Sequence, residues 1–267
     1  SVTQKRIESA TTSGGLVIYV NFNDITLNGN TFTTSTEFYQ NLLKSCGSIP
    51  MNFDRIYEYR FKGIPIEKKQ SVWYEISQFL HREMGQPSIV LDPAAGFCEF
   101  INSIPAKERW AIDQNSKFLN EHAAPDIHKI IGDCMNAVVP TGYFDAVFVS
   151  NFLEHLGNTK VVYDFFTKAY QWLKPSGLLV VMGPNFKYCV GDYFDCSDHK
   201  VILTDISLTE IGYSAGFEIK KCHSRFLPYS FRSRLPTSPT LVHNYLRFPL
   251  IWPLLGKQFL VFFQKPL

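Results

Sequence analysis

Residues Ser88–Asn115, SIVLDPAAGFCEFINSIPAKERWAIDQN, contain the clearest indication of the fold. A short apolar run leads to Asp92, a turn of small residues follows, and a predicted helix begins at Phe100. A second apolar strand then ends in Asp113, which lies 113 − 92 = 21 positions after the first acid. A strand-helix-strand unit with an acid about 20 residues further on holds a nucleoside ribose.

The turn after the first strand, DPAAGFC at 92–98, contains a single glycine. A dinucleotide site needs three glycines so that backbone can approach a pyrophosphate, whereas Ala94 and Gly96 allow close approach of an uncharged or zwitterionic group. The turn resembles the first motif of the class I S-adenosylmethionine-dependent methyltransferases, acid-x-Gly-x-Gly-x-Gly, at Asp92, Ala94, Gly96 and Cys98. On this stretch alone, an ordinary turn of another doubly wound protein remains an alternative.

Three further landmarks follow in the order that this family has them. An apolar strand at 144–150 runs into Glu-His-Leu at 154–156, Leu-Lys-Pro-Ser-Gly at 173–177 precedes another strand, and Ala-Gly-Phe at 215–217 precedes a third. The overall pattern is similar to methyltransferases of the small-molecule and sugar type, found in glycan or secondary-metabolite pathways. The resemblance covers roughly residues 52 to 267 and leaves the first 50 residues outside it.

The resemblance implies an α/β, Rossmann-like fold. We expect a seven-stranded mixed sheet of order 3-2-1-4-5-7-6 with helices on both faces. Residues 1–50 are interpreted as an N-terminal extension with a strand or hairpin and a short helix. Residues 51–267 then form the methyltransferase domain, with a lid inserted at 226–257 between the last two strands.

Composition excludes several classes of protein. Apolar residues make up 45% of the 267, so a packed core is expected, and 26 Lys and Arg against 24 Asp and Glu give no broad field for a nucleic acid. The six cysteines include no C-x-x-C pair, which predicts neither a zinc site nor a disulfide framework and fits a reducing cytoplasm. No apolar run reaches the length of about 18 residues that a membrane span needs.

The family likeness also implies roles for single residues. Asp113 would bind the ribose hydroxyls and Asp133 would accept from the adenine amino group, and no metal is expected. The complete set of expected S-adenosylmethionine contacts is Asp92, Ala94, Gly96, Asp113, Gln114, Asp133, Cys134, Ser150, Asn151, Tyr57 and Arg60.

Two histidines are candidates for the base that removes a proton from a hydroxyl acceptor. Histidine titrates near neutrality, and both His155 and His199 follow strand ends where this fold places its ligands. We favour His199, on a Tyr-rich loop, as the base and give His155 a structural or cofactor-side role. Acceptor contacts are predicted at Asn185, Tyr188, Tyr193, Arg225 and Tyr245.

The insertion at 226–257 has three interpretations. It contains an apolar stretch at 241–255, which predicts a substrate lid, a patch that docks a lipid-linked or membrane-surface acceptor, or a helix packed on the sheet. The leading function is methyl transfer to a hydroxyl or amine of a small-molecule, sugar or glycan acceptor. A nicotinamide oxidoreductase and a non-catalytic, methyltransferase-like interaction module remain alternatives.

Overall fold

The computed structural model describes residues 18–20, 25–27, 30–32, 55–56, 59–60, 62–63, 65–228 and 238–267. The chain divides into two compact units, Ser1–Gly63 and Ile64–Leu267. In the first unit, strands β1 (Ile18–Val20), β2 (Ile25–Leu27) and β3 (Asn30–Phe32) form an antiparallel sheet in that order. This confirms the predicted extended pattern, while the short helix expected after it lies outside the described residues.

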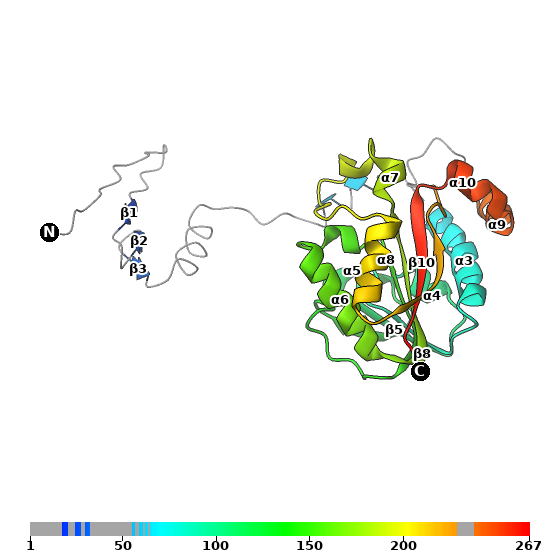
Figure 1. Ribbon diagram of the computed structural model, residues 1–267, viewed down its shortest axis with the longest axis horizontal. Helices are drawn as coiled ribbons and strands as arrows, with labels where there is room; N and C mark the ends of the chain where they lie inside the picture. The colour runs from blue at the N-terminus through cyan, green and yellow to red at the C-terminus, as the bar shows by residue number, and fades with distance from the viewer. Residues whose placement is uncertain are drawn as a thin grey trace. The chain divides into compact units, whose positions relative to one another are not determined.

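The second unit carries the seven remaining strands and the helices around them (Figure 1). The strands are β4 (Ile89–Asp92), β5 (Glu108–Asp113), β6 (His128–Ile131), β7 (Phe144–Ser150), β8 (Leu173–Pro184), β9 (Glu218–His223) and β10 (Gln258–Gln264). The α-helices are α3 (Ile66–Glu83), α4 (Glu99–Ser103), α5 (Ser116–His122), α6 (Thr159–Trp172), α7 (Phe186–Cys189), α8 (Asp205–Ser214), α9 (Pro239–Arg247) and α10 (Trp252–Leu255). Short 3₁₀ turns are η1 (Leu153–His155), η2 (Tyr193–Asp195) and η3 (Pro249–Ile251).

The strand order is β6-β5-β4-β7-β8-β10-β9, and β10 runs antiparallel to both of its neighbours. If the seven strands of this unit are numbered from 1 to 7 along the chain, their order across the sheet is 3-2-1-4-5-7-6, as the sequence predicted. The central strand β7 is buried along nearly its whole length, because helices cover both faces of a parallel sheet. The sheet therefore presents one edge at which β4, β5, β7 and β8 all end together.

Two hydrophobic clusters lie on the two faces of the sheet. Figure 1 shows α6 and α8 on one side and α3 and α9 on the other. Phe165 and Phe166 of α6 are fully buried in one cluster, and Leu80 of α3 and Ile101 of α4 are fully buried in the other. Asn115 caps α5 by accepting hydrogen bonds from the N–H groups of the first turn, which explains why that helix begins at Ser116.

Strand β8 begins earlier than the sequence predicted. The Leu-Lys-Pro-Ser-Gly run at 173–177 was expected to precede the strand, but it lies within β8. The N–H of Ser176 donates to the carbonyl of Lys265 at 3.0 Å, and the N–H of Lys265 donates to the carbonyl of Gly177 at 2.9 Å. Pairing with the C-terminal segment, which no local pattern signals, therefore extends the strand.

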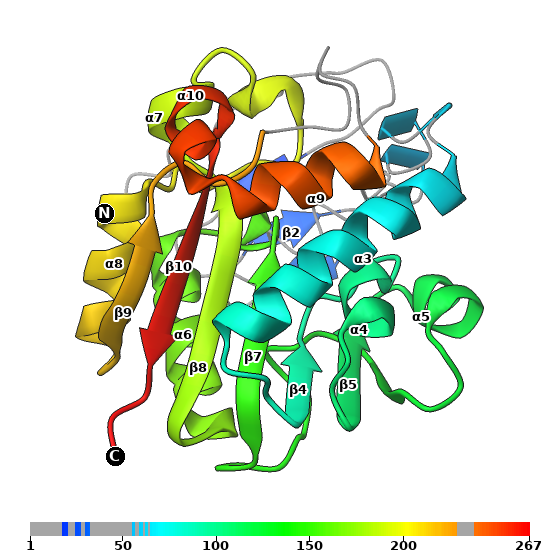
Figure 2. The ribbon, with the colours of Figure 1, turned by 90° about the vertical axis from the view of Figure 1, so that its right-hand side faces the viewer.

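The insertion between β9 and β10 contributes to the core. Trp252 is 4% exposed, and its ring lies edge-on to Phe79 of α3 at 5.7 Å and to Phe226 at 4.9 Å. Figure 2 shows α9 running beside α3 over the same face of the sheet. Among the three interpretations of this segment, the described part of it fits a helix packed on the sheet, and residues 229–237 lie outside the described residues.

Candidate functional site

The polar candidates follow neighbouring strands at the carboxyl edge of the sheet. Asp113 ends β5, Asp92 ends β4, Asn151 follows β7 and Asn185 follows β8, and these strands are adjacent in that order. Ligands of open α/β sheets bind outside the carboxyl ends of the strands, at the point where the strand order reverses. Here the order reverses between β4 and β7, so this edge is the candidate site.

Two residues of the turn after β4 have a left-handed backbone conformation. Gly96 has φ +52° and Cys98 has φ +62°, and the latter stands where the family motif has its third glycine. A non-glycine residue in this region is strained, but the Cys98 side chain is fully buried in the core beneath the turn. Burial also raises the pKa of its thiol to about 12, so Cys98 has a packing role.

Asp113 ties this turn to the second strand. Its Oδ2 accepts from the N–H of Gly96 at 2.7 Å, and its Oδ1 accepts from the N–H of Asn115 at 2.8 Å. Burial raises the pKa of Asp113 above its ordinary value, while these two hydrogen bonds act in the opposite direction. Each carboxylate oxygen has a second lone pair, so two further hydroxyl groups can still donate to the same side chain.

Asp92 is a buried carboxyl group beside other acids. It is 4% exposed, and one oxygen accepts from the N–H of Ala94 at 3.2 Å. Burial raises the pKa of Asp92 to about 8, the hydrogen bond from Ala94 lowers it, and the charges of Asp113 and Glu99 raise it further. At neutral pH this site therefore favours a ligand that brings positive charge to Asp92.

The other predicted cofactor contacts are distributed along the same edge. Asp133 accepts from the N–H of Met135 at 2.9 Å, and Cys134 is buried with its thiol pKa raised to about 12 by burial. Ser150 ends β7, and Asn151 follows it with φ +47°. Gln114 is exposed. Arg60 belongs to the first unit, and Tyr57 lies outside the described residues.

An aromatic and charged cluster beside the turn was missed from sequence. Phe97 stacks on Phe118 of α5 with ring centroids 4.3 Å apart. Lys69 of α3 lies 4.5 Å from the Phe97 ring centroid and pairs with Glu99 at 2.6 Å. Lys69 precedes Glu99 by 99 − 69 = 30 positions, and no local motif links them. The packing of α3 on α4 brings them together.

Four titratable side chains converge beyond β7 and β8. The Nε2 atoms of His155 and His199 each lie 4.0 Å from Oε1 of Glu154. The Nδ1 of His155 lies 3.2 Å from the carbonyl oxygen of Asp198 and 3.3 Å from its carboxylate. Glu154, Asp198 and His199 are buried, and backbone hydrogen bonds from Lys200 and Val201 to the carbonyl of Glu154 hold the loop in place. We name Glu154, His155, Asp198 and His199 the Glu–His cluster.

The Glu–His cluster unites both histidine candidates with a carboxylate that the sequence reasoning did not single out. The two imidazole rings lie edge to face with centroids 4.8 Å apart. One ligand atom each from Glu154, His155 and His199 lie within 4.8 Å of one another, and imidazole with carboxylate is a set that divalent zinc accepts. These three residues could hold a cation, although the sequence predicts none.

The predicted acceptor contacts have different surroundings. Tyr188 is partly exposed, with the Arg225 guanidinium 4.7 Å from its ring centroid. Tyr193 is fully buried and its hydroxyl donates to the carbonyl of Val201, while the Tyr245 hydroxyl donates to the carbonyl of Phe226.

Asn185 is also fully buried, and its amide donates at 2.9 Å both to Asp205 and to the carbonyl of Ser224. Like Tyr193 and Tyr245, it therefore has its side-chain hydrogen-bonding groups directed to protein partners. Tyr188 and Arg225 are the two predicted acceptor contacts that lie at the surface together.

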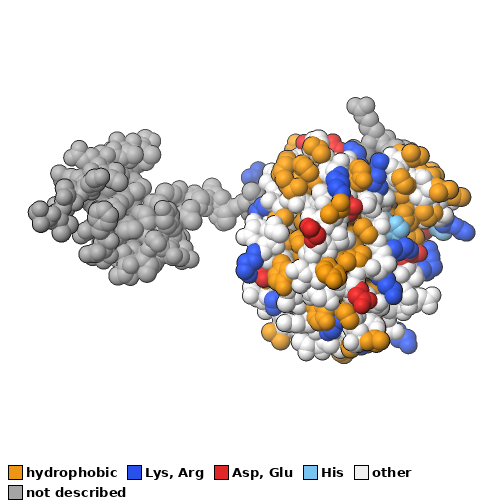
Figure 3. Space-filling model, viewed as in Figure 1, with side chains coloured by type: hydrophobic (Ala, Val, Ile, Leu, Met, Phe, Trp, Pro, Cys, Tyr) orange, Lys and Arg blue, Asp and Glu red, His pale blue; other side chains and the backbone are white. Residues whose placement is uncertain are grey.

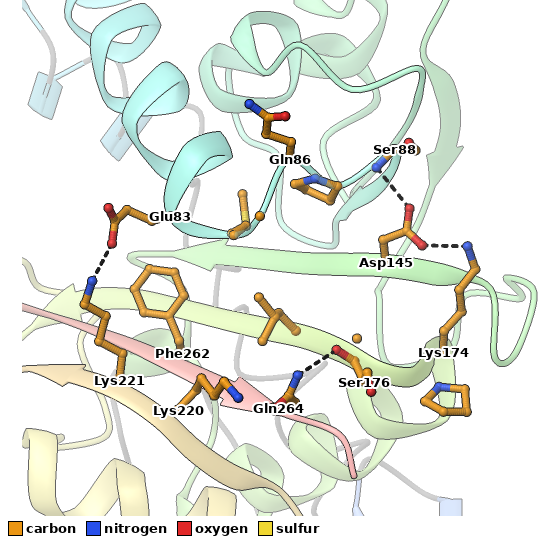
Figure 4. Close-up of a pocket in the computed structure, with 16 residues that line it drawn as sticks. Glu83, Gln86, Ser88, Asp145, Lys174, Ser176, Lys220, Lys221, Phe262 and Gln264 are labelled. Carbon is orange, nitrogen blue, oxygen red and sulfur yellow. Dashed lines mark hydrogen bonds and ion pairs between the residues drawn. The ribbon is translucent and has the colours of Figure 1, made fainter. Parts of the chain in front are cut away.

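A depression of about 580 Å³ lies at the opposite edge of the sheet, where the parallel strands begin (Figure 4). Two of the three lysines that line it form ion pairs within the protein: Lys174 pairs with Asp145 at 2.6 Å, and Lys221 pairs with Glu83. Asp145 also accepts from the N–H groups of Ser88 and Ile89. This network fixes the start of β4, and we give it a structural role.

Comparisons with known proteins agree with this geometry. Residues 91–181 match the family model described as "Methyltransferase domain". No curated protein matches the chain in sequence. A SAM-dependent methyltransferase from Archaeoglobus fulgidus is similar in structure, with a TM-score of 0.56 and 17% identity over 80% of this chain and 100% of the other.

Two more solved structures share the fold. A protein from Thermotoga maritima, described as a SAM-dependent methyltransferase and "possible histamine N-methyltransferase", has a TM-score of 0.54 and 15% identity over 80% of this chain and 96% of its own. The cyclase SpnF has a TM-score of 0.53 and 15% identity over 73% and 81%. The family match spans the turn after β4, Asp113 and β7, so residues 91–181 are similar to a methyltransferase domain, and these solved structures share the fold of the chain.

Proposed function

We propose that this protein transfers a methyl group to a hydroxyl of a saccharide or other small-molecule acceptor. The observation that carries the proposal is the row of polar groups along one edge of the sheet. Asp113 and Asp92 on β5 and β4 serve the cofactor, and the Glu–His cluster beyond β7 and β8 serves the acceptor.

S-adenosylmethionine supplies a methyl group on a positively charged sulfur, which is a good leaving group. The acceptor oxygen forms its bond to the methyl carbon as the carbon–sulfur bond breaks, and the hydroxyl proton must leave. In this proposal, a ring nitrogen of His199 takes that proton, since imidazole accepts protons near neutral pH. The protein mainly aligns the two reactants.

The carboxylate of Glu154 would stabilise the imidazolium that forms on His199. It lies 4.0 Å from the His199 Nε2 and is itself buried, so little solvent screens the interaction. Asp198 would hold His155 through its Nδ1, which leaves the His155 Nε2 facing Glu154. Asp198 and Glu154 are thus positioning residues in this proposal.

The function is tested by calorimetry followed by methyl-transfer assays. S-adenosylmethionine should bind the full chain and NAD should not, and hydroxyl-bearing saccharides should accept label from methyl-labelled cofactor. If matched amino sugars were methylated only at nitrogen, the acceptor group would be an amine and not a hydroxyl. Absence of cofactor binding would instead support a non-catalytic module, while NAD binding would support an oxidoreductase.

Chelation separates a histidine base from a metal at the Glu–His cluster. If His199 removes the proton itself, turnover after dialysis against EDTA should equal that of the untreated protein. Loss of activity that zinc or magnesium restores would mean that Glu154, His155 and His199 hold a cation. Metal content measured before and after dialysis checks that the chelator removed whatever was bound.

Replacement of Asp113 by Ala should weaken S-adenosylmethionine binding by about 1.5 to 3 kcal/mol, the value of hydrogen bonds to a charged group. The change also removes the acceptor for the N–H of Gly96, so the turn after β4 loses the hydrogen bond that holds it to the end of β5. Isothermal titration calorimetry measures the effect. Glu121→Ala, an exposed acid on α5, is the matched control and should bind as wild type. Unchanged affinity in folded Asp113→Ala protein would exclude Asp113 as the ribose ligand.

A further inference from the structure

Lys69 and Glu99 form an ion pair beside the turn that follows β4. Their charged groups lie 2.6 Å apart, and each side chain is only 12% exposed. Figure 3 shows acidic and basic side chains dispersed over one face of the second unit, where solvent screens their charges. The Lys69–Glu99 pair is largely shielded from solvent, so both charges act on nearby groups with less screening.

Two helices bring this pair to the turn. Lys69 lies near the start of α3 and Glu99 is the first residue of α4, and Figure 2 shows α4 beside α3. The Lys69 ammonium also lies 4.5 Å from the ring centroid of Phe97, which follows Gly96 in the turn. Lys69 therefore places a positive charge beside the turn that is expected to meet the cofactor.

Glu99 is one of two acids whose charges act on Asp92. Asp92 is 4% exposed, and its pKa is raised to about 8, first by burial and then by the charges of Asp113 and Glu99. The hydrogen bond from the N–H of Ala94 lowers this pKa, but burial outweighs it. Two negative charges beside a third carboxyl group favour its protonated form. A protonated Asp92 offers no charge to a cationic ligand.

Other ionisable groups on the neighbouring elements are neutral, distant or act elsewhere. Burial raises the pKa of the Cys98 thiol to about 12, so this group is uncharged at neutral pH, and Lys129 of β6 acts on that thiol. The ionisable side chains at the starts of β5 and β7 lie at the opposite edge of the sheet: Glu108, Arg109 and Asp145. On α3, Lys69 is the cation that pairs with Glu99.

We propose that Lys69 is a positioning residue for the cofactor: by balancing the charge of Glu99, it allows Asp92 to meet the cationic part of S-adenosylmethionine as a carboxylate. This inference rests on the proposed function for the identity of the ligand. Lys69 acts through Glu99 and needs no contact with the cofactor. Without the lysine charge, Asp92 lies beside an unbalanced negative charge and should keep its proton to a higher pH.

The ionisation of Asp92 can be measured in the unliganded full chain by NMR of labelled aspartate carboxyl carbons, with Asp92→Asn to identify the signal. Lys69→Met should raise the pH at which Asp92 is half ionised by about 0.5 to 1. Glu99→Gln should lower that pH, and the double variant should return it to the wild-type value or below. Lys69→Arg keeps the charge and should titrate as wild type. Lys221→Met, which removes the ion pair between β9 and α3, is the matched control and should also titrate as wild type.

Calorimetry with S-adenosylmethionine gives a second measurement. At pH 7, Lys69→Met should bind about 3- to 10-fold more weakly than wild type, because the ionised fraction of Asp92 falls by that factor. The difference should narrow as the pH rises toward 9, and it should disappear in the double variant with Glu99→Gln. A lysine that only packs α3, or that contacts the cofactor itself, would weaken binding at every pH, and Glu99→Gln would not restore it.

An unchanged Asp92 titration in folded Lys69→Met protein would overturn the proposal, as would a loss of binding that Glu99→Gln does not restore. Circular dichroism checks the fold. If Lys69→Met does not fold, Glu99→Gln alone decides, because a half-ionisation pH of Asp92 no lower than in wild type would overturn the proposal. If wild type binds no S-adenosylmethionine, the proposed function fails, while the NMR titration still shows whether Lys69 sets the charge of Asp92.

Discussion

Replacing His199 by Asn should lower kcat by about 10² to 10⁴-fold, the usual contribution of a positioned base, while S-adenosylmethionine affinity stays the same. Asparagine keeps a hydrogen-bonding group of similar size in a position that is only 8% exposed, so the fold should persist. The wild-type rate should also fall on acidification, because the imidazole then already carries a proton. Steady-state kinetics across pH with a saccharide acceptor measure both effects.

The pH profile distinguishes a base from a packing residue. His199→Asn should lose the acid limb that wild type shows, whereas a residue that only fills space would change kcat without changing the profile. Glu154→Gln is the companion variant. It should lower kcat less than His199→Asn does, because it weakens support for the imidazolium and leaves the imidazole present. A near-normal rate with an unaltered profile in His199→Asn would turn attention to His155 or Tyr188.

Replacing Asp92 by Asn should make the unliganded protein more stable at pH 8 and weaken cofactor binding. An aspartate in the unfolded chain ionises near pH 4, whereas burial raises the pKa of Asp92 in the folded protein to about 8. Between these values the folded state binds one more proton than the unfolded state. Wild-type stability should therefore fall as pH rises from about 4 to 8, by at most about 1.4 kcal/mol per pH unit from this group.

Urea unfolding at several pH values measures this effect. Asp92→Asn should lack the part of the slope that Asp92 contributes, and the gain over wild type should disappear toward pH 4. Glu121→Gln, at an exposed position on α5, should follow wild type at every pH. Identical slopes in Asp92→Asn and wild type would show that Asp92 titrates normally. Cofactor binding by wild type should also release a proton near neutral pH, which calorimetry in buffers of different ionisation enthalpy detects.

The sequence predicted much of the fold because strong local signals coincide with burial. The strand 144–150 has the predicted ends, because it is a mostly apolar run and lies in the middle of the sheet. Boundaries shifted where distant pairing decides them, as at the start of β8.

The site was less predictable, because it depends on which strands are neighbours. His199 and Glu154 are 199 − 154 = 45 positions apart in the sequence. They lie close together because β7 and β8 are neighbours in the sheet. Residue type alone also does not tell how deeply a side chain is buried, as at Asn185 and Tyr193, which were predicted as acceptor contacts. Both are buried with hydrogen bonds to protein groups, and a polar side chain in a core must find such partners.

The hydrogen bonds that close the insertion bear on how such enzymes can be re-engineered. The N–H of Phe226 donates to the carbonyl of Gln258 at 2.6 Å, and the N–H of Lys257 donates to the carbonyl of Leu227 at 2.8 Å. With both ends fastened at one point, each doubling of the enclosed length costs only about 0.6 kcal/mol in closure entropy. The residues between these two ends can therefore be replaced by another segment, provided that Leu246 and Trp252, which are buried in the core, are kept. A graft that keeps those two side chains should change what the enzyme meets at its surface while the cofactor edge stays as it is.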